Sequence, residues 1–307
     1  MMTSDVARFR GRFAPSPSGP LHFGSLVAAV GSYLQAKSQG GEWLLRIEDI
    51  DTTRVQAGAA DRILRTLEQF GLYWDQTETY QTQRLPLYQA VFEQLRQQQK
   101  IYGCNCSRAR IQSLGGIYDG YCQQRASSTG NNDQAVAWRL LPGFVSHSFT
   151  DLVFGTVAIP KAICQEHYSI KRRDGLFAYQ LVVVVDDLEQ QIGQVIRGAD
   201  LLEMTTRQQA LCHLLGRTAP EYGHLPLAVT APGQKLSKQN HATDICSQPL
   251  SQSLQQALAL LGHPVPASLQ EAPVPELLSW ALQHWQLAQV PKTTEVLIES
   301  QDRPNFR

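Results

Sequence analysis

Apolar residues alternate between two spacings over the first part of this chain. Residues 9–14 and 42–48 have the composition of short strands, and apolar positions recur at helical spacing over 26–34 after the first of them. Further helices are expected over 57–70 and 86–99. This order of strand, loop and helix is typical of an α/β fold with a mostly parallel sheet.

The same alternation returns after a stretch that contains cysteines. The run over 177–185 is rich in valine, so we predict a strand there that is covered on both faces. The remaining expected elements are strands over 135–140, 149–159, 195–200 and 224–230, and a helix over 205–215.

After about residue 240 the pattern becomes purely helical. Segments 251–261 and 275–287 have helical periodicity and are separated by a proline-rich stretch. We therefore divide the chain into the first half of an α/β core, a cysteine-containing insertion, the second half of the core and a short helical C-terminal segment. The predicted boundaries are 1–99, 100–130, 131–242 and 243–307.

Composition narrows the class of protein. The chain has 307 residues, of which 43% are hydrophobic and 18% charged, so it can bury a sizeable core. Its first residues lack a basic stretch followed by an apolar run, and its apolar runs are too short to cross a bilayer. These features predict a cytoplasmic protein with no membrane partner.

Charge gives no overall sign of a nucleic-acid partner. The 27 basic and 27 acidic side chains balance, so any contact with RNA must come from a local patch. The candidates are Arg108 with Arg110 and Arg125, and the basic run 171–173. Each is equally typical of a solvated charged surface.

The loop over 15–25 carries the features of a phosphate site. Gly19 and Gly24 allow close approach of the backbone, and the following helix offers free N–H groups to phosphate oxygens. His22 can donate to the same oxygens. Alone, such a loop is an ordinary connection between a strand and a helix.

The full set of motifs resembles a known family. His22-Phe-Gly-Ser25 resembles the HIGH signature of class I aminoacyl-tRNA synthetases, and residues 235–239 resemble their KMSKS loop. Segments 12–19, 46–54 and 196–201 resemble the glutamyl branch, and the likeness runs from about residue 10 to 242. It implies a class I synthetase core that is Rossmann-like.

Two further features resemble the glutamyl-queuosine tRNA(Asp) synthetase family. One is the string over 110–122, and the other is that only the 69 residues from 239 to 307 follow Lys238. A glutamyl-tRNA synthetase carries a large helical anticodon-binding region after this point. The resemblance therefore implies a zinc-binding insertion and a short helical C-terminal segment, with no anticodon-binding domain.

This resemblance also implies an activity. Members of the family activate L-glutamate with ATP and Mg²⁺ without tRNA, and then esterify the queuosine base at the wobble position of tRNA(Asp). The RNA partner would be the queuosine-modified anticodon stem-loop, with residues 171–174 placed to hold its phosphates. No protein nucleophile is needed, because catalysis comes from positioning and from stabilising charge on phosphate oxygens.

Site residues follow from the same resemblance. The expected catalytic residues are His22, Lys235 and Lys238. ATP is expected to contact His22, Gly24, Ser25 and Lys238. The expected glutamate-binding residues are Arg12, Ala14, Ser16, Glu48, Tyr179 and Arg197.

Residue chemistry supports two of these assignments, and two other positions differ from the family signatures. The guanidinium of Arg12 suits a side-chain carboxylate and would select glutamate over glutamine, and Glu48 can hold an ammonium group. Ser25 replaces the last histidine of HIGH, and Gln239 replaces the last residue of KMSKS. Both changes are normal in the queuosine-directed branch.

A separate cysteine cluster predicts a metal site. Cys104, Cys106 and Cys122 can reach one tetrahedral Zn²⁺, although their spacing alone fits unliganded thiols equally well. The resemblance adds Tyr118 as the fourth ligand and makes the zinc structural. The other cysteines are expected to be small buried residues, and His213 and His224 are expected to be packing or surface residues.

Two other function classes remain open from the sequence. A conventional glutamyl-tRNA synthetase fragment would charge the 3′ end of a tRNA. A non-catalytic RNA-binding paralogue would keep the fold and lose activity, which the presence of Arg12, His22, Glu48 and Lys238 disfavours.

Overall fold

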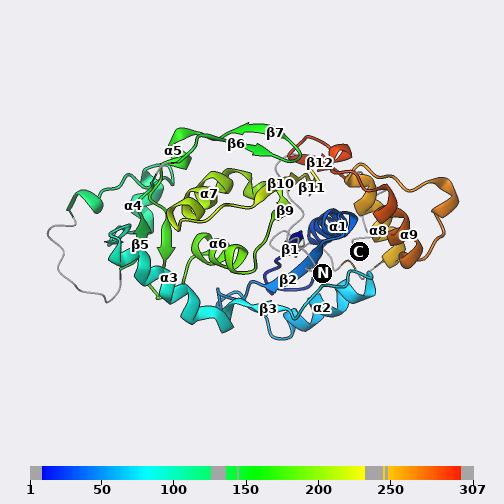
Figure 1. The fold of residues 1–307 in the computed structure, drawn as a ribbon, viewed down its shortest axis with the longest axis horizontal. Helices are drawn as coiled ribbons and strands as arrows, with labels where there is room; N and C mark the ends of the chain where they lie inside the picture. Colours follow the sequence, from blue (N-terminus) through cyan, green and yellow to red (C-terminus); the bar gives the residue numbers. More distant parts are fainter. Residues whose placement is uncertain (1–8, 126–135, 144, 232–244, 246–247, 299–307) are drawn as a thin grey trace, which may run out of the picture.

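The computed structural model describes residues 9–125, 136–143, 145–231, 245 and 248–298 of the 307-residue chain (Figure 1). Its helices are α1 (Phe23–Ser38), α2 (Ala59–Gln69), α3 (Leu85–Gln97), α4 (Arg108–Ser113), α5 (Lys161–Cys164), α6 (Tyr179–Glu189), α7 (Thr205–Leu214), α8 (Leu250–Leu260) and α9 (Val274–His284). Its strands are β1 (Arg10–Phe13), β2 (Glu42–Ile47), β3 (Thr79–Tyr80), β4 (Ile101–Cys104), β5 (Ala137–Leu140), β6 (Ser148–Asp151), β7 (Gly155–Ala158), β8 (Ser169–Lys171), β9 (Gln194–Gly198), β10 (Glu221–Leu225), β11 (Leu227–Val229) and β12 (Glu295–Leu297).

Parallel strands form the centre of the molecule. β1, β2 and β3 pair in parallel in the order β1-β2-β3, and β9 pairs in parallel with β10. The two groups lie side by side, since β1 contacts β9 and the N–H of Gly193 donates to the carbonyl of Arg10 at 2.9 Å. The carboxyl ends of β1, β2 and β9 therefore meet at one edge, where ligands bind in open α/β sheets.

Helix α1 joins this sheet to the C-terminal helices. Its residues are buried along almost the whole helix, because β1 and β9 cover one side and α8 and α9 cover another. Leu26 and Trp43 belong to the same buried cluster as Leu254, Leu258 and Leu277. The C-terminal helices thus extend the main core.

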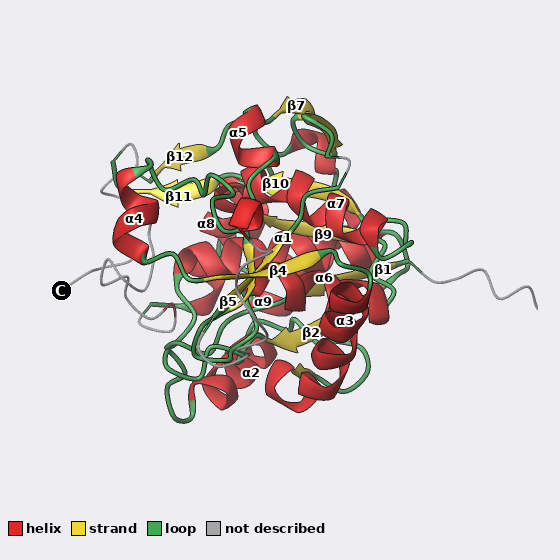
Figure 2. Ribbon diagram, turned by 90° about the vertical axis from the view of Figure 1, so that its left-hand side faces the viewer, coloured by secondary structure: helices red, strands yellow, loops and turns green. Residues whose placement is uncertain are grey.

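A small antiparallel sheet stands apart from the parallel strands. β4 pairs with β5, and β5 pairs with β8, in the order β4-β5-β8. Figure 1 shows this sheet and α4 at one end of the long axis and α8 with α9 at the other, and Figure 2 shows α4 at the edge of the molecule. None of the helices in the described ranges has both the length and the apolar composition needed to cross a lipid bilayer.

Most of the expected elements are confirmed, but the strand predicted over 177–185 is wrong. Residues Tyr179–Glu189 form helix α6, in which every residue from Gln180 to Leu188 is buried. A helix that is buried on nearly all sides reads as a continuous apolar run, as a strand covered on both faces does. Valine prefers strands only weakly, so packing decides the outcome here.

Two other predicted strands are divided in the structure. The strand expected over 149–159 is the antiparallel hairpin of β6 and β7, and Gly155 lies beside the turn with a φ of 77°. The strand expected over 224–230 is interrupted at Pro226, which separates β10 from β11. Proline donates no backbone hydrogen bond, so it ends the pairing with β9.

Candidate active site

A pocket of about 590 Å³ opens at the carboxyl edge of the parallel strands. It is lined by the ends of β1, β2 and β9, by the start of α1 and by the start of α6. The residues predicted from the sequence that line it are Arg12, Ala14, Ser16, His22, Gly24, Ser25, Glu48, Tyr179 and Arg197. Lys235 and Lys238 lie outside the described residues.

Backbone hydrogen bonds join the two loops that form one wall of this pocket. The N–H of Glu48 donates to the carbonyl of Pro15 at 2.9 Å, and the N–H of Gln56 donates to that of Pro17 at 3.0 Å. The loop after β1 is therefore held against the segment after β2. This contact brings Ser16 and Glu48 to the same pocket although they belong to different strand ends.

His22 caps helix α1 with its side chain. Its Nδ1 accepts a hydrogen bond from the N–H of Ser25 at 3.2 Å, and its Nε2 lies 3.1 Å from the hydroxyl of Ser25. A neutral imidazole that accepts at Nδ1 carries its proton on Nε2, which can donate. The start of α1 thus presents an imidazole N–H at the positive end of the helix dipole, where the N–H of Ser25 is used by the cap.

Arg12 is paired with an acidic residue of α6. Its Nε and Nη2 donate to the two carboxylate oxygens of Asp187 at 3.2 and 3.3 Å, and both side chains are buried. Within the described part of the chain, Nη1 of Arg12 has no protein partner. This nitrogen remains available to an acceptor in the pocket.

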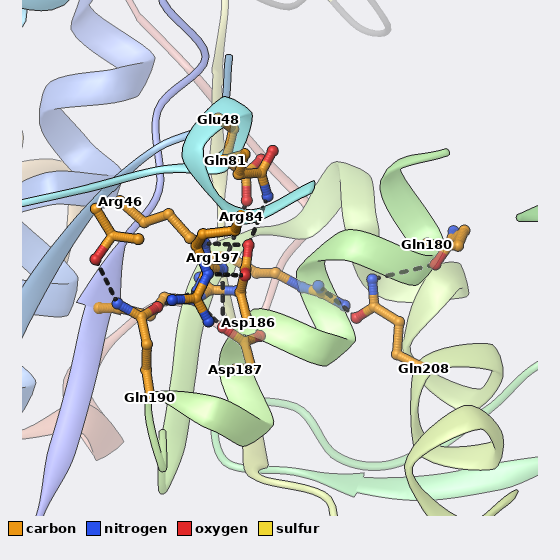
Figure 3. Close-up of polar contacts among 12 residues, drawn as sticks. Arg46, Glu48, Gln81, Arg84, Gln180, Asp186, Asp187, Gln190, Arg197 and Gln208 are labelled. Carbon is orange, nitrogen blue, oxygen red and sulfur yellow. Dashed lines mark hydrogen bonds and ion pairs between the residues drawn. The ribbon is translucent and has the colours of Figure 1, made fainter. Parts of the chain in front are cut away.

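Arg46 lies at the centre of a buried ionic network (Figure 3). Its Nη2 is 2.8 Å from Asp187 and 3.5 Å from Glu48, and its Nε is 3.6 Å from Asp186. Arg84 pairs with Asp186 at 2.7 Å. Buried charges are costly unless they are paired and hydrogen-bonded, and this network pairs them.

Two of the three acidic residues that face Arg46 have opposite pKa shifts. Burial raises the pKa of Glu48 to about 7, and the opposing effect of Arg46 is smaller. Burial would also raise the pKa of Asp187, but Arg12 and Arg46 together hold it below its usual value. Glu48, whose ion pair with Arg46 is 3.5 Å long, is therefore more weakly paired than Asp187.

Arg197 differs from the other buried arginines of the site. Its guanidinium donates to His224 Nε2 at 3.1 Å, to Gln208 at 2.7 Å, to Thr205 at 2.9 Å and to the carbonyl of Leu201 at 3.2 Å. None of these groups is a carboxylate, and no described carboxylate forms an ion pair with it. A buried cation of this kind, exposed only to a pocket, favours an anionic ligand.

Tyr179 stands at the first turn of α6 and lines the same pocket. Its hydroxyl has no hydrogen-bond partner among the residues that the structure describes. Burial raises its pKa, and the positive charge of Arg197 has a smaller opposing effect. The phenol therefore stays protonated at neutral pH and can donate to a ligand.

The predicted metal ligands come together beside β4 and α4. The sulfurs of Cys104, Cys106 and Cys122 lie within 4.8 Å of one another, and those of Cys106 and Cys122 are 3.5 Å apart. The hydroxyl of Tyr118 is 4.0 Å from the sulfur of Cys106. Four donors in a tetrahedron about Zn²⁺ have this spacing, since Zn–S bonds of about 2.3 Å separate sulfurs by about 3.8 Å.

Comparison with known proteins identifies the family. The family model for class I tRNA synthetases (E and Q), catalytic domain, matches residues 8–263. The chain is 50% identical over 287 residues to a glutamyl-Q tRNA(Asp) synthetase of Vibrio vulnificus (strain YJ016), covering 93% of this chain and 92% of that protein. The chain belongs to the glutamyl-Q tRNA(Asp) synthetase family of class I tRNA synthetases.

Another glutamyl-Q tRNA(Asp) synthetase, from Serratia proteamaculans (strain 568), is 50% identical over 292 residues, which are 95% of each chain. The fold also matches a glutamate-tRNA synthetase from Elizabethkingia anophelis with a TM-score of 0.79 and 23% identity. That match covers 96% of this chain and 69% of the other. Membership in the glutamyl-Q tRNA(Asp) synthetase family confirms the predicted class I fold and a ligase-type, synthetase-like enzyme.

The sequence analysis missed two residues that contact the predicted glutamyl-Q tRNA(Asp) synthetase site. Asp187 pairs with Arg12, but a strand was expected at 177–185 and no helical position beyond it was considered. His224 was treated as a packing or surface residue, and the structure places it against Arg197. The only sequence signal for His224 is its place in a predicted strand next to the strand that carries Arg197.

Proposed function

We propose that this chain activates L-glutamate with ATP in the absence of tRNA and transfers it to the queuosine base of tRNA(Asp). The observation that carries the proposal is the 50% identity, over nearly their whole length, to relatives named glutamyl-Q tRNA(Asp) synthetase. The pocket adds physical support, because it combines a neutralised arginine, an unpaired arginine, a weakly paired glutamate and a helix N-terminus. We expect the enzyme to act in the cytoplasm.

Glutamate would bind by complementary charges. Arg197 lacks a carboxylate partner and Arg12 keeps Nη1 unbonded, so these guanidinium groups would hold the substrate's carboxylate. Glu48 would take the α-ammonium group, and the hydroxyl of Tyr179 would donate to an oxygen. Ala14 and Ser16 would lie along the bound amino acid. Glutamine carries no side-chain charge and would leave a buried guanidinium uncompensated.

Adenylate formation needs orientation and charge stabilisation. An oxygen of the glutamate α-carboxylate attacks the α-phosphorus of ATP, and pyrophosphate leaves with the electrons of the broken P–O bond. The imidazole N–H of His22 and the first turn of α1, with Gly24 and Ser25, would stabilise charge on the phosphate oxygens. Lys235 and Lys238 would follow the charge onto pyrophosphate, with Mg²⁺ bound to the nucleotide.

Transfer to RNA would follow in the same pocket. A hydroxyl of the queuosine ring attacks the carbonyl of the glutamyl-adenylate, an ester bond forms and AMP leaves. Arg172 pairs with Asp51 at 3.1 Å, and Asp51 belongs to the segment that lies close to Ser16 and Glu48. The basic run 171–173 is therefore joined to the pocket entrance, which supports its proposed contact with the anticodon stem-loop.

Zinc would serve the structure of the insertion. Cys104, Cys106, Tyr118 and Cys122 would hold one ion, and their donor set and spacing fit it. When bound, the ion supplies a crosslink between β4 and the loop after α4, with no open position for catalysis. The guanidinium carbon of Arg139 lies 3.8 Å from the centre of the Tyr118 ring, a cation–π contact that helps to hold this ring in place.

The test uses the anticodon stem-loop of tRNA(Asp) as a free RNA with a 3′-phosphate, which removes the acceptor end. One sample carries queuosine at the wobble position and the matched control carries guanosine. We expect labelled glutamate to join only the queuosine sample, in an alkali-labile ester. Glutamylation of intact tRNA at its 3′ end, with none on the queuosine stem-loop, would contradict the proposal and favour a conventional synthetase.

A further inference from the structure

A chain of buried hydrogen bonds leads from Arg197 to Asp151, which does not line the pocket. The Nε of Arg197 donates to Nε2 of His224 at 3.1 Å, and Nδ1 of His224 lies 2.6 Å from the carboxylate of Asp151. His224 and Asp151 both have fully buried side chains. The three residues lie on β9, β10 and β6, which pair with one another in the order β6-β10-β9.

The orientation of Asp151 is fixed by the backbone. Its Oδ1 accepts from the N–H groups of Val153 and Phe154, each at 2.9 Å, which leaves Oδ2 for His224. A carboxylate only accepts and a guanidinium only donates, so the imidazole between them must donate at Nδ1 and accept at Nε2. Asp151 and Arg197 together therefore select one neutral tautomer of His224.

This arrangement separates the charge of Asp151 from that of Arg197. Arg12 touches the carboxylate of Asp187 directly, so its positive charge is offset by a charged partner through two of its five N–H donors. Arg197 contacts neutral groups only, and a neutral imidazole stands between it and Asp151. Its guanidinium is thus held in position while its charge remains available to a ligand.

We propose that Asp151 and His224 are positioning residues for glutamate binding, which set the orientation of Arg197 through the tautomer of the imidazole. This inference rests on the proposed function, in which Arg197 holds a carboxylate of glutamate. Neither residue lines the pocket or touches the substrate position, so neither is catalytic. Their effect is on the affinity for glutamate and not on the affinity for ATP.

The decisive variant is Asp151→Asn, which has the same shape. The amide oxygen can keep both backbone hydrogen bonds, and the amide nitrogen then faces Nδ1 of His224 as a donor. The imidazole then accepts at Nδ1 and carries its proton on Nε2, where the hydroxyl of Thr205 at 3.3 Å can take it, and the Nε–H of Arg197 loses its acceptor. We expect the KM for glutamate in ATP–pyrophosphate exchange to rise about tenfold or more, with the KM for ATP nearly unchanged.

Two further measurements separate a positioning role from a merely structural one. Nitrogen NMR of the imidazole should show the proton of His224 on Nδ1 in the wild type and on Nε2 in Asp151→Asn. His224→Gln keeps an acceptor oxygen close to the place of Nε2 and should retain most of the glutamate affinity, whereas His224→Leu should lose it. His213→Gln, at an exposed position on α7, is the matched control and should have no effect.

The outcomes distinguish this inference from the proposed function. If the wild-type chain shows no glutamate-dependent exchange, the proposed function fails and the role of the pair fails with it. If the wild type is active and Asp151→Asn keeps the wild-type KM for glutamate, only the positioning role is overturned. The same holds if His224→Gln and His224→Leu lose glutamate affinity equally while both remain folded.

Discussion

Glu48 is the residue whose protonation should control the first step of the reaction. Its carboxylate lies 3.5 Å from Arg46, which is itself committed to Asp187 at 2.8 Å. Burial therefore dominates and raises the pKa of Glu48 to about 7. The residue sits close to its own titration point at neutral pH, so it gains most from a cationic ligand such as an α-ammonium group.

The pH dependence of glutamate use should report this residue. Below pH 7 the protonated Glu48 is neutral and cannot pair with ammonium, so kcat/KM for glutamate should fall by about tenfold per pH unit. We expect Glu48→Gln to lower kcat/KM at neutral pH and to remove this acid limb. The measurement is ATP–pyrophosphate exchange between pH 5.5 and 8.5, and an identical acid limb in both proteins would contradict the assignment.

Helix α6 shows where the prediction of helices from the spacing of apolar residues fails. The spacing of apolar residues identified α1, α2, α3, α7, α8 and α9, because each has a polar side or clear ends. It failed for α6, which is buried around its whole circumference. The residues predicted from short motifs line one pocket. The partners of Arg12 and Arg197, which are Asp187 and His224, were not predicted because neither partner lies in a recognisable motif.

The packing of α6 against its neighbours depends on the buried carboxylate of Asp186. Its carboxylate accepts from Gln81 at 2.9 Å, from Arg84 at 2.7 Å and from the hydroxyl of Tyr88 at 2.9 Å. Asp186→Asn removes the counter-charge of Arg84 and one of the three carboxylates near Arg46, so it should lower the free energy of unfolding by about 3–5 kcal/mol. Urea denaturation measures this, and the exposed Asp61→Asn on α2 is the control that should change it by less than about 0.5 kcal/mol.

The cysteine cluster should act as a local unit. Cys104→Ser removes a buried ligand at the end of β4, so bound zinc measured by elemental analysis should fall below one equivalent. Hydrogen exchange should then rise in residues 101–125 and stay unchanged in α1. Cys212→Ser is the control, because Cys212 is buried on α7 far along the chain from the cluster and should not alter metal content. Full metal content in Cys104→Ser would contradict the zinc assignment.

At the scale of the whole molecule, the C-terminal helices are joined to the α/β core. The indole N–H of Trp285 donates to Gln35 of α1 at 2.9 Å, and Gln35 donates to Gln194 of β9 at 3.0 Å. Gln194 in turn donates to Glu221 of β10 at 2.8 Å. One line of hydrogen bonds therefore runs from the end of α9 to the strands that carry Arg197 and His224.

Trp285→Phe should test this connection. Phenylalanine keeps the ring that stacks on His263 but removes the donor, so the buried amide oxygen of Gln35 loses its partner. We expect a loss of about 1–3 kcal/mol in the free energy of unfolding. The matched control is Trp280→Phe. This change keeps an aromatic ring stacked on His284, and Trp280 donates no side-chain hydrogen bond within the described residues. Equal losses in the two variants would show that the hydrogen bond contributes little.

The pairing of Arg46 with Asp187 also bears on how the chain is made. These residues are separated by 141 positions, and Arg12 and Asp187 by 175. On the ribosome the strands β1 and β2 emerge long before α6, and until then burying their arginines would leave both charges unmatched. We expect nascent chains that end before Asp187 to stay open to protease and to bind chaperones, and chains that include α6 to close. The ion pairs of Asp187 with these two arginines would thus delay closure of the fold until α6 has been made.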